Sequence, residues 1–265
     1  MTLLTVKDLE LRFGQLTAFE GVSFEVDEGE LLAVIGPNGA GKTSLFNVLS
    51  RVYRPNAGGV WVRERDVLSL RASQLAGIGV ARTFQNLGLF AHLSVLENVM
   101  IGRHHLMRAG TLRAGLWWGF AGREEREHRA QAREALEFVG IARLAARPVQ
   151  TLPYGLQKRV ELARALAMEP RLLMLDEPVS GMSADERSEM TELVRRMHGR
   201  GLTMLLIEHD MGMVMQVAQR VLVMDFGRVI ACGPPAEVQH DEHVIRAYLG
   251  QDPDQAAAAG EQRRA

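Results

Sequence analysis

A glycine-rich loop is the part of the sequence whose residue types and spacing point most directly to chemistry. It reads Gly-Pro-Asn-Gly-Ala-Gly-Lys-Thr over residues 36–43 and continues into a helical pattern. Glycines let the backbone curl so that successive N–H groups face phosphate oxygens, and the N-terminus of the following helix adds a partial positive charge. In such a loop Lys42 reaches the β- and γ-phosphates and the Thr43 hydroxyl ligates Mg²⁺. We therefore predict a nucleoside triphosphate site formed by Gly36, Pro37, Asn38, Gly39, Ala40, Gly41, Lys42, Thr43 and Ser44.

Two adjacent carboxylates, Asp176 and Glu177, form the second candidate site. They follow the apolar run Leu172–Leu175, and ligand sites of open α/β sheets lie at the carboxyl ends of buried strands. Asp176 is suited to the coordination shell of Mg²⁺, and Glu177 is suited to polarise an attacking water near the γ-phosphate. The guanine-reading N-K-x-D motif is absent from the sequence. An ATPase or a small-molecule kinase is therefore favoured over a GTPase.

Short apolar runs alternate with helical patterns and predict an α/β core around both sites. Strands buried on both faces of a parallel sheet are expected at the continuous apolar runs, which are Leu31–Ile35, Leu172–Leu175, Thr203–Ile207 and Val221–Met224. Half-exposed strands are expected where polar residues alternate with β-branched or aromatic ones, at Thr5–Phe13, Val22–Asp27 and Val60–Arg65. Helices are expected at an apolar stripe of helical spacing, made of Met190, Leu193, Val194 and Met197, and over about residues 87–150.

The composition is that of a folded chain without a strong electrostatic preference. Apolar residues make up 47% and charged residues 24% of the 265, a balance that excludes a disordered or fibrous protein. The 31 Lys and Arg residues nearly cancel the 32 Asp and Glu residues, so no overall attraction to nucleic acid or to an anionic membrane is expected. The sequence has no signal-peptide pattern, no run of about 18 uncharged apolar residues and a single cysteine, Cys232. Any role at a membrane is expected to come through a partner.

Four further segments resemble motifs of the ATP-binding subunits of ABC transporters. Arg82–Asn86 (RTFQN) resembles the glutamine loop, and Leu152–Leu166 resembles the signature segment L-S-G-G-Q-x-x-R with the helix behind it. Ser180–Ser183 stands where the dimer-crossing loop is expected, and Leu206–Asp210 (LIEHD) resembles the segment of the switch histidine. The resemblance covers about residues 3–250 of the chain.

The resemblance implies roles for individual side chains. Gln85 would contact Mg²⁺ or the lytic water, His209 would contact the γ-phosphate, and Phe13 would stack on the adenine ring. Tyr154 and Gly155 of the signature segment would face the nucleotide of a second subunit. The expected catalytic residues are then Glu177, His209 and Gln85, and the expected metal ligands are Thr43, Gln85 and Asp176.

The signature segment and the crossing loop depart from the family pattern. Pro153 replaces the signature serine and offers neither a hydroxyl nor an N–H group. Tyr154 replaces the first glycine and Leu156 the glutamine, so backbone N–H groups near Gly155 and the helix N-terminus are expected to contact phosphate in place of side chains. Ser183 stands where the crossing loop usually has an aspartate.

The resemblance also implies a fold and an assembly. The fold is α/β: a P-loop NTPase (RecA-like) core with an antiparallel β subdomain and an inserted α-helical subdomain at about residues 87–160, all within one nucleotide-binding domain over residues 1–250. Residues 251–265 are expected to be a frayed tail. The implied cofactors are ATP and Mg²⁺. The implied partners are a second nucleotide-binding subunit (a copy or a paralogue), membrane permease subunits and, indirectly, an extracytoplasmic solute receptor. The implied location is peripheral, on the cytoplasmic face of the inner membrane. No nucleic acid partner is implied.

Finer details resemble the larger ATP-binding subunit of branched-chain amino acid importers. These details are the Tyr-Gly form of the signature, the RTFQN and IEHDM stretches, the ending Val244–Gly250, and extra residues over Leu106–Gly122 that include Trp117 and Trp118. ATPase subunits of related systems for urea, amides or lipopolysaccharide are the close alternatives, and a soluble ABC ATPase without a transport role is a further one. Substrate choice belongs to partner proteins in such systems, so the amino acid assignment depends on the resemblance alone.

Overall fold

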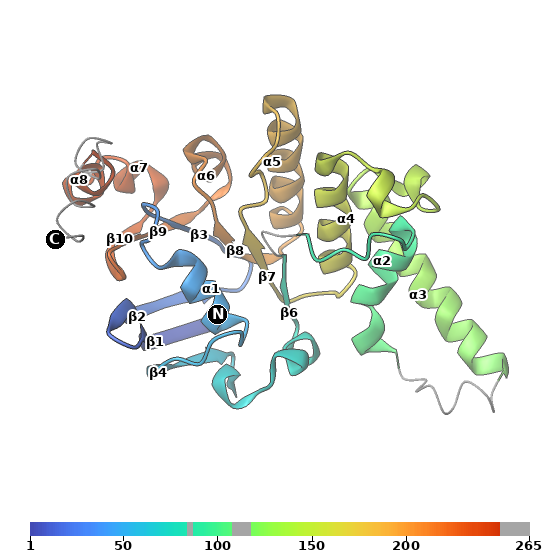
Figure 1. The fold of residues 1–265 in the computed structure, drawn as a ribbon, viewed down its shortest axis with the longest axis horizontal. Coiled ribbons are helices and arrows are strands. Elements are labelled where there is room, and N and C mark those ends of the chain that lie inside the picture. The colour runs from blue at the N-terminus through green and yellow to red at the C-terminus, as the bar shows by residue number, and fades with distance from the viewer. Residues whose placement is uncertain (84–86, 108–117, 250–265) are drawn as a thin grey trace. The chain divides into compact units, whose positions relative to one another are not determined.

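The computed structural model describes residues 1–83, 87–107 and 118–249 (Figure 1). The chain forms two compact units. Unit 1 consists of Met1, Asp27–Glu30 and Ser69–Leu205, and unit 2 consists of Thr2–Val26, Leu31–Leu68 and the residues from Leu206 onward. The predicted glutamine-loop residue Gln85, the predicted tail and Trp117 lie outside the described residues.

Unit 2 contains a four-stranded antiparallel sheet with the strand order β2-β1-β4-β5. Its strands are β1 (Thr2–Phe13), β2 (Leu16–Asp27), β4 (Ala57–Val62) and β5 (Arg65–Asp66). β1 and β4 pair through Leu4 with Val62 and Val6 with Val60, so their apolar side chains share one face. The predicted strand Val60–Arg65 is wrong at its end, because Arg63 adopts a φ of 52° and the chain turns there into β5.

The rest of unit 2 is α/β. β3 (Leu31–Ile35) pairs in parallel with β9 (Arg220–Asp225), and β10 (Arg228–Gly233) pairs antiparallel to β9. All five residues of β3 are buried, which confirms the strand predicted from its continuous apolar run. The helices of this unit are α1 (Lys42–Leu49), α6 (Met211–Val217), α7 (Pro235–Val238) and α8 (Glu242–Leu249).

Unit 1 combines parallel strands with the longer helices. β6 (Val80–Arg82) pairs in parallel with β7 (Leu172–Asp176). The boundary between the units falls within β8 (Thr203–Ile207). β6, β7 and β8 belong to a six-stranded sheet, in which the strands are hydrogen-bonded in the order β10-β9-β3-β8-β7-β6. The longer helices are α2 (Val95–Gly102), α3 (Trp118–Phe138), α4 (Tyr154–Leu166) and α5 (Ala184–His198). Single-turn 3₁₀ helices lie at Val67–Ser69, which straddles the boundary before unit 1, and at Ala72–Gln74, Ala76–Ile78, His104–Leu106, Ala142–Leu144 and Val149–Thr151.

Helices α2, α3 and α4 contact one another in unit 1 (Figure 1). α2 begins at a capping box, in which the Ser94 hydroxyl accepts from the N–H of Glu97 while the Glu97 carboxylate accepts from the N–H of Ser94. In α5 the predicted stripe is buried at Met190, Leu193, Val194 and Met197. The helical predictions for these segments are therefore confirmed.

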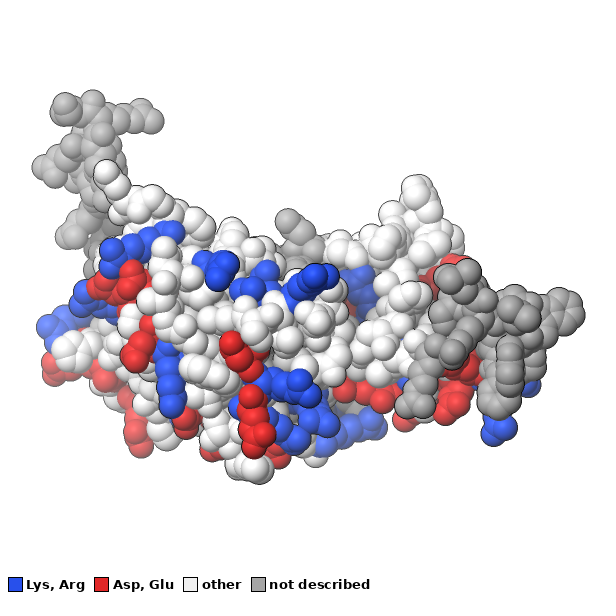
Figure 2. Space-filling view, turned by 90° about the horizontal axis from the view of Figure 1, so that it is seen from below, with Lys and Arg blue, Asp and Glu red and all other residues white. Residues whose placement is uncertain are grey.

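The surface drawn in Figure 2 carries both signs of charge. Lys and Arg side chains and Asp and Glu side chains both occur on this face, and the formal net charge of the chain is −1. None of the helices in the described part of the chain combines the length and the apolarity that crossing a membrane requires.

Candidate nucleotide-binding site

The glycine-rich loop of unit 2 joins β3 to α1 and encloses the Lys42 ammonium. Nζ donates hydrogen bonds to the carbonyl oxygens of Gly36 (2.6 Å) and Pro37 (2.9 Å), and Lys42 is only 8% exposed. Gly36 and Gly41 have φ values of 146° and 100°, and a methyl group on Gly36 would collide with the Met224 carbonyl oxygen. Only glycine fits this path. The loop therefore holds the Lys42 ammonium against two of its own backbone carbonyl groups.

The two hydroxyl residues that begin α1 are accessible. Thr43 is exposed and Ser44 is half-buried at the N-terminus of the helix, which is capped by Gly41 without a side-chain hydrogen bond. Asn38 and Gly39 are exposed at the tip of the loop. An anion placed at this end of the helix would meet backbone N–H groups and the positive end of the helix dipole.

Phe13 and Tyr248 are two aromatic residues of unit 2 with a bearing on the site. The Phe13 side chain is 45% exposed, and its ring meets the ring of Tyr53 edge to face with centroids 5.2 Å apart. Part of the Phe13 side chain is therefore accessible, as a role in stacking on adenine requires. Tyr248 of α8, to which the sequence assigned no role, makes a hydrogen bond with the backbone of Gly36. Burial raises the pKa of the Tyr248 hydroxyl above its usual value, and this hydrogen bond partly offsets the shift.

The predicted switch residue His209 follows β8, and its backbone is fixed by its neighbour Glu208. The Glu208 carboxylate is fully buried and accepts hydrogen bonds from the N–H groups of His209 (2.9 Å) and Asp210 (3.1 Å). Asp210 in turn caps α6 by accepting from the N–H of Met213. The His209 side chain is largely exposed. Glu208 was missed as a positioning residue, although a carboxylate directly after an apolar strand was a signal.

The two predicted carboxylates stand at the end of β7 in unit 1. Asp176 is buried, and its Oδ2 lies 2.7 Å from Nη2 of Arg82. Its backbone N–H donates to the hydroxyl of Thr83 at 3.2 Å. Glu177 is half-buried and has a φ of 47°, a left-handed conformation that is uncommon for a residue with a side chain. Of these two consecutive residues, Asp176 is thus buried and Glu177 half-buried.

The signature helix α4 starts at Tyr154, with Pro153 as its N-cap and no side-chain cap. Gly155 packs so closely on α5 that a methyl group there would collide with the Glu186 carboxylate. Tyr154 lies beside Gly181 of the crossing loop and is 42% exposed. The signature segment and the crossing loop of the same chain are therefore in direct contact in unit 1.

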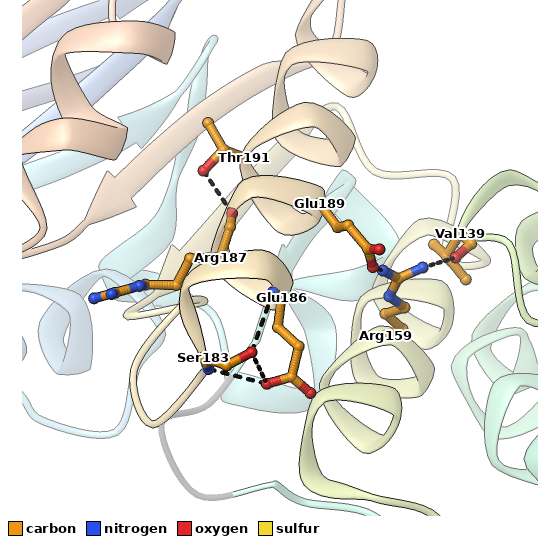
Figure 3. Close-up of polar contacts among 7 residues, drawn as sticks. All are labelled: Val139, Arg159, Ser183, Glu186, Arg187, Glu189 and Thr191. Carbon is orange, nitrogen blue, oxygen red and sulfur yellow. Dashed lines mark hydrogen bonds and ion pairs between the residues drawn. The ribbon is translucent and has the colours of Figure 1, made fainter.

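Ser183 has a clear structural role in place of the aspartate of the family pattern. Its hydroxyl accepts from the N–H of Glu186 (3.3 Å), and the Glu186 carboxylate accepts from the N–H and the hydroxyl of Ser183 (both 3.0 Å), as Figure 3 shows. This capping box starts α5. Figure 3 also shows Arg159 of α4 pairing with Glu189 of α5 and donating to the Val139 carbonyl oxygen.

The predicted residues thus fall into two groups. Phe13, the residues of the loop 36–44 and His209 belong to unit 2, whereas Asp176, Glu177, Tyr154 and Gly155 belong to unit 1. Three further residues contact members of these groups, although the sequence did not indicate it. Arg82 contacts Asp176, Glu208 contacts His209, and Tyr248 contacts Gly36.

Known proteins are similar to this chain over nearly its whole length. A family model described as "ABC transporter" matches residues 19–180, and one described as "Branched-chain amino acid ATP-binding cassette transporter" matches residues 228–254. The chain is 40% identical over 250 residues to the high-affinity branched-chain amino acid transport ATP-binding protein LivG of Salmonella typhimurium, covering 94% of this chain and 98% of LivG. It is 39% identical over 251 residues to BraF of Pseudomonas aeruginosa, with the same two shares.

A solved structure agrees with these matches. The crystal structure of an ATP-binding cassette of an ABC transporter in its ADP conformation superposes with a TM-score of 0.82 at 30% identity, covering 95% of this chain and all of that one. The fold is thus the ATP-binding cassette fold, with a mixed sheet flanked by helices and an antiparallel β subdomain. The phosphate loop, the carboxylates after β7 and these full-length likenesses together establish that the chain belongs to the ABC transporter family, as one of its ATP-binding proteins.

Proposed function

We propose that this chain is the ATP-hydrolysing subunit of an importer for branched-chain amino acids. The observation that carries the ATPase activity is the Lys42 ammonium inside the glycine-rich loop. The choice of transported substrate is supported by the family match over residues 228–254 and by the similarity to LivG and BraF, which are branched-chain amino acid transport ATP-binding proteins. Urea, amide and lipid systems remain the alternatives that the transport experiment must separate.

ATP binding is assigned to residues of unit 2. The Lys42 ammonium would exchange its contacts with Gly36 and Pro37 for the β- and γ-phosphate oxygens, which offer it a full negative charge. The remaining N–H groups of the loop would bind phosphate oxygens at the N-terminus of α1. Phe13, whose side chain is partly exposed, would stack on the adenine.

The residues proposed as metal ligands fit Mg²⁺ by their chemistry. Thr43 and Gln85 offer neutral oxygens and Asp176 a carboxylate, and oxygen ligands of this kind, completed by phosphates and water, are what Mg²⁺ prefers. When bound, Mg²⁺ would neutralise charge on the β- and γ-phosphates. Thr43 is exposed, and the buried carboxylate of Asp176 is held by Arg82.

Hydrolysis is assigned to Glu177, His209 and Gln85. Glu177 would accept a proton from the attacking water, since its carboxylate is half-buried next to Asp176. His209 would donate a hydrogen bond to the γ-phosphate from a backbone fixed by Glu208. Gln85 would orient the water or contact the metal.

The proposed assembly pairs this chain with a second nucleotide-binding subunit, either a copy or a paralogue. Backbone groups of Tyr154 and Gly155 would then face the nucleotide of the opposite subunit. The pair would bind membrane permease subunits on the cytoplasmic face of the inner membrane, and an extracytoplasmic receptor would deliver the amino acid. No nucleic acid partner is proposed.

The test is transport in liposomes that contain the chain with its co-purifying membrane subunits and solute receptor. ATP hydrolysis that rises on addition of leucine, isoleucine or valine, together with uptake of the amino acid, is the expected result. Stimulation by urea, amides or a lipid instead would reject the proposed substrate. A complex without any ATP hydrolysis would reject the function altogether.

A further inference from the structure

A buried ion pair joins the end of β6 to the end of β7 in unit 1. Nη2 of Arg82 lies 2.7 Å from Oδ2 of Asp176, and the two side chains are 7% and 2% exposed. This is the carboxylate to which the proposed function assigns Mg²⁺. A charge-assisted hydrogen bond of this length, shielded from water, occupies one oxygen of the carboxylate.

The local structure fixes both partners. In the parallel ladder Arg82 is the register partner of Met174, two residues before Asp176. Thr83 continues this pairing, because its N–H donates to the Met174 carbonyl oxygen (2.9 Å) and its hydroxyl accepts from the N–H of Asp176. The Arg-Thr pair of the RTFQN stretch thus binds both the backbone and the side chain of Asp176.

We propose that Arg82 is a positioning residue that holds the Asp176 carboxylate and opposes the binding of a divalent cation until nucleotide is present. This inference depends on the proposed role of Asp176 as a metal ligand. The guanidinium holds the carboxylate in one orientation through the 2.7 Å contact. A metal ion at the same carboxylate must either displace the guanidinium or approach it as a second positive charge.

The electrostatics set the order of binding. In a water-poor environment the repulsion between a divalent cation and the guanidinium is weakly screened. The phosphates of ATP carry the negative charge that offsets this repulsion, so the metal binds as its nucleotide complex. Removing the guanidinium should leave the buried Asp176 carboxylate without its charge partner, and the loss of such a partner is strongly destabilising. The same loss should make the carboxylate a better ligand for a free cation.

The test is a titration of the full chain with Mn²⁺ in the absence of nucleotide, followed by electron paramagnetic resonance. Arg82→Gln is expected to bind Mn²⁺ about tenfold more tightly than the unmodified chain, or more tightly still. The double variant Arg82→Gln with Asp176→Asn should return to the weak binding of the unmodified chain. A folded Arg82→Gln variant with unchanged Mn²⁺ affinity would overturn the proposal.

A matched control separates this role from a general effect on folding. Arg103 pairs with Glu169 in the same unit at 2.9 Å, and its side chain is similarly buried at 6% exposed. Arg103→Gln should lower the melting temperature without changing Mn²⁺ affinity; a similar gain in Mn²⁺ affinity in this variant would count against the proposal.

Thermal unfolding provides a second measurement in case Arg82→Gln folds poorly. Mg²⁺ alone should raise the melting temperature of this variant, or restore its folding, and should leave the unmodified chain unchanged. A variant that stays unfolded in Mg²⁺ would contradict the proposal. These experiments contain no nucleotide, so their failure is distinct from a failure of the unmodified chain to hydrolyse ATP.

Discussion

The Glu186 carboxylate fills the space beside the backbone of Gly155 that any larger side chain at position 155 would need. Glu186 is at the same time the third residue of α5 and closes the capping box with Ser183. The first turn of the signature helix therefore packs directly on the cap that follows the crossing loop. Glycine at this position of the signature segment is therefore favoured by contacts within one chain, whatever it does toward nucleotide.

The first prediction is that the sign of the effect of Gly155→Ala on stability depends on Glu186. In the unmodified chain the new methyl group displaces the carboxylate and breaks the cap, so the free energy of unfolding should fall. In a Glu186→Ala background the clash is gone, and alanine should stabilise α4 by up to about 1 kcal/mol, because it is a better helix former than glycine. Urea unfolding measures both effects.

Gly77→Ala is the matched control for this cycle, since nothing lies within 4 Å of the added methyl group. It should change the free energy of unfolding by the same small amount in both backgrounds. Equal effects of Gly155→Ala with and without Glu186 would show that the two residues do not interact.

The second prediction concerns the pH dependence of the Ser183 cap. Hydrogen bonds from the backbone N–H and the hydroxyl of Ser183 lower the pKa of Glu186. A lowered folded-state pKa adds stability above the unfolded-state pKa of about 4.3, and this stability is lost as the pH falls through the folded-state pKa. Ser183→Ala removes the hydroxyl, so near neutral pH the free energy of unfolding of this variant should be lower than that of the unmodified chain by about 1 kcal/mol. This difference between the two proteins should shrink below about pH 4.

Urea unfolding at several pH values, with the two proteins compared at each, tests this dependence. Thr151→Ala serves as a control, because that hydroxyl donates to a backbone carbonyl oxygen and contacts no carboxylate in the described structure. Its deficit should not vary over the same pH range. A deficit of Ser183→Ala that stays constant with pH would mean that the hydroxyl does not stabilise the ionised form of Glu186.

Local patterns predicted the phosphate loop and the buried strands because each is written in consecutive residues. β3 and β8 begin and end where their apolar runs do, and Lys42 lies where the glycine spacing places it. The short strand β6 and the edge strand β10 were missed. β6 has three residues, which are too few for a periodic pattern in the sequence. The residues of β10 are exposed or half-buried without alternation, so this strand has no pattern of one apolar and one polar face.

The contacts that fix the candidate residues were harder to predict. Arg82 and Asp176 are 94 residues apart in the chain, and only the register of β6 against β7 brings them together. Glu208 acts on the backbone of its neighbours, a role that carries no fixed sequence motif. Ser183 departs from the family pattern, and its capping role becomes visible only when Glu186 is considered with it.

The third prediction tests the phosphate loop through two lysines of the same chain. Lys42→Ala should weaken ATP binding by on the order of tenfold to a hundredfold, because charge-assisted contacts to phosphate are lost. Lys7→Ala is the matched control, since Lys7 is exposed on β1. Calorimetric titration with ATP should find its affinity unchanged. Unaltered ATP affinity in Lys42→Ala would reject the proposed role of the loop.

The fourth prediction assigns the chemical step to Glu177. Glu177→Gln keeps the size of the side chain and the turn after β7 but removes the base, so turnover of ATP should fall by about a hundredfold or more while ATP binding persists. Because ATP is then retained, the variant should form a stable dimer in the presence of ATP, measured by light scattering after size-exclusion chromatography. Glu192→Gln changes an exposed carboxylate of α5 in the same unit and should keep normal turnover. Normal hydrolysis by Glu177→Gln would require a different base, and loss of ATP binding by this variant would show that Glu177 acts in binding rather than in the chemical step.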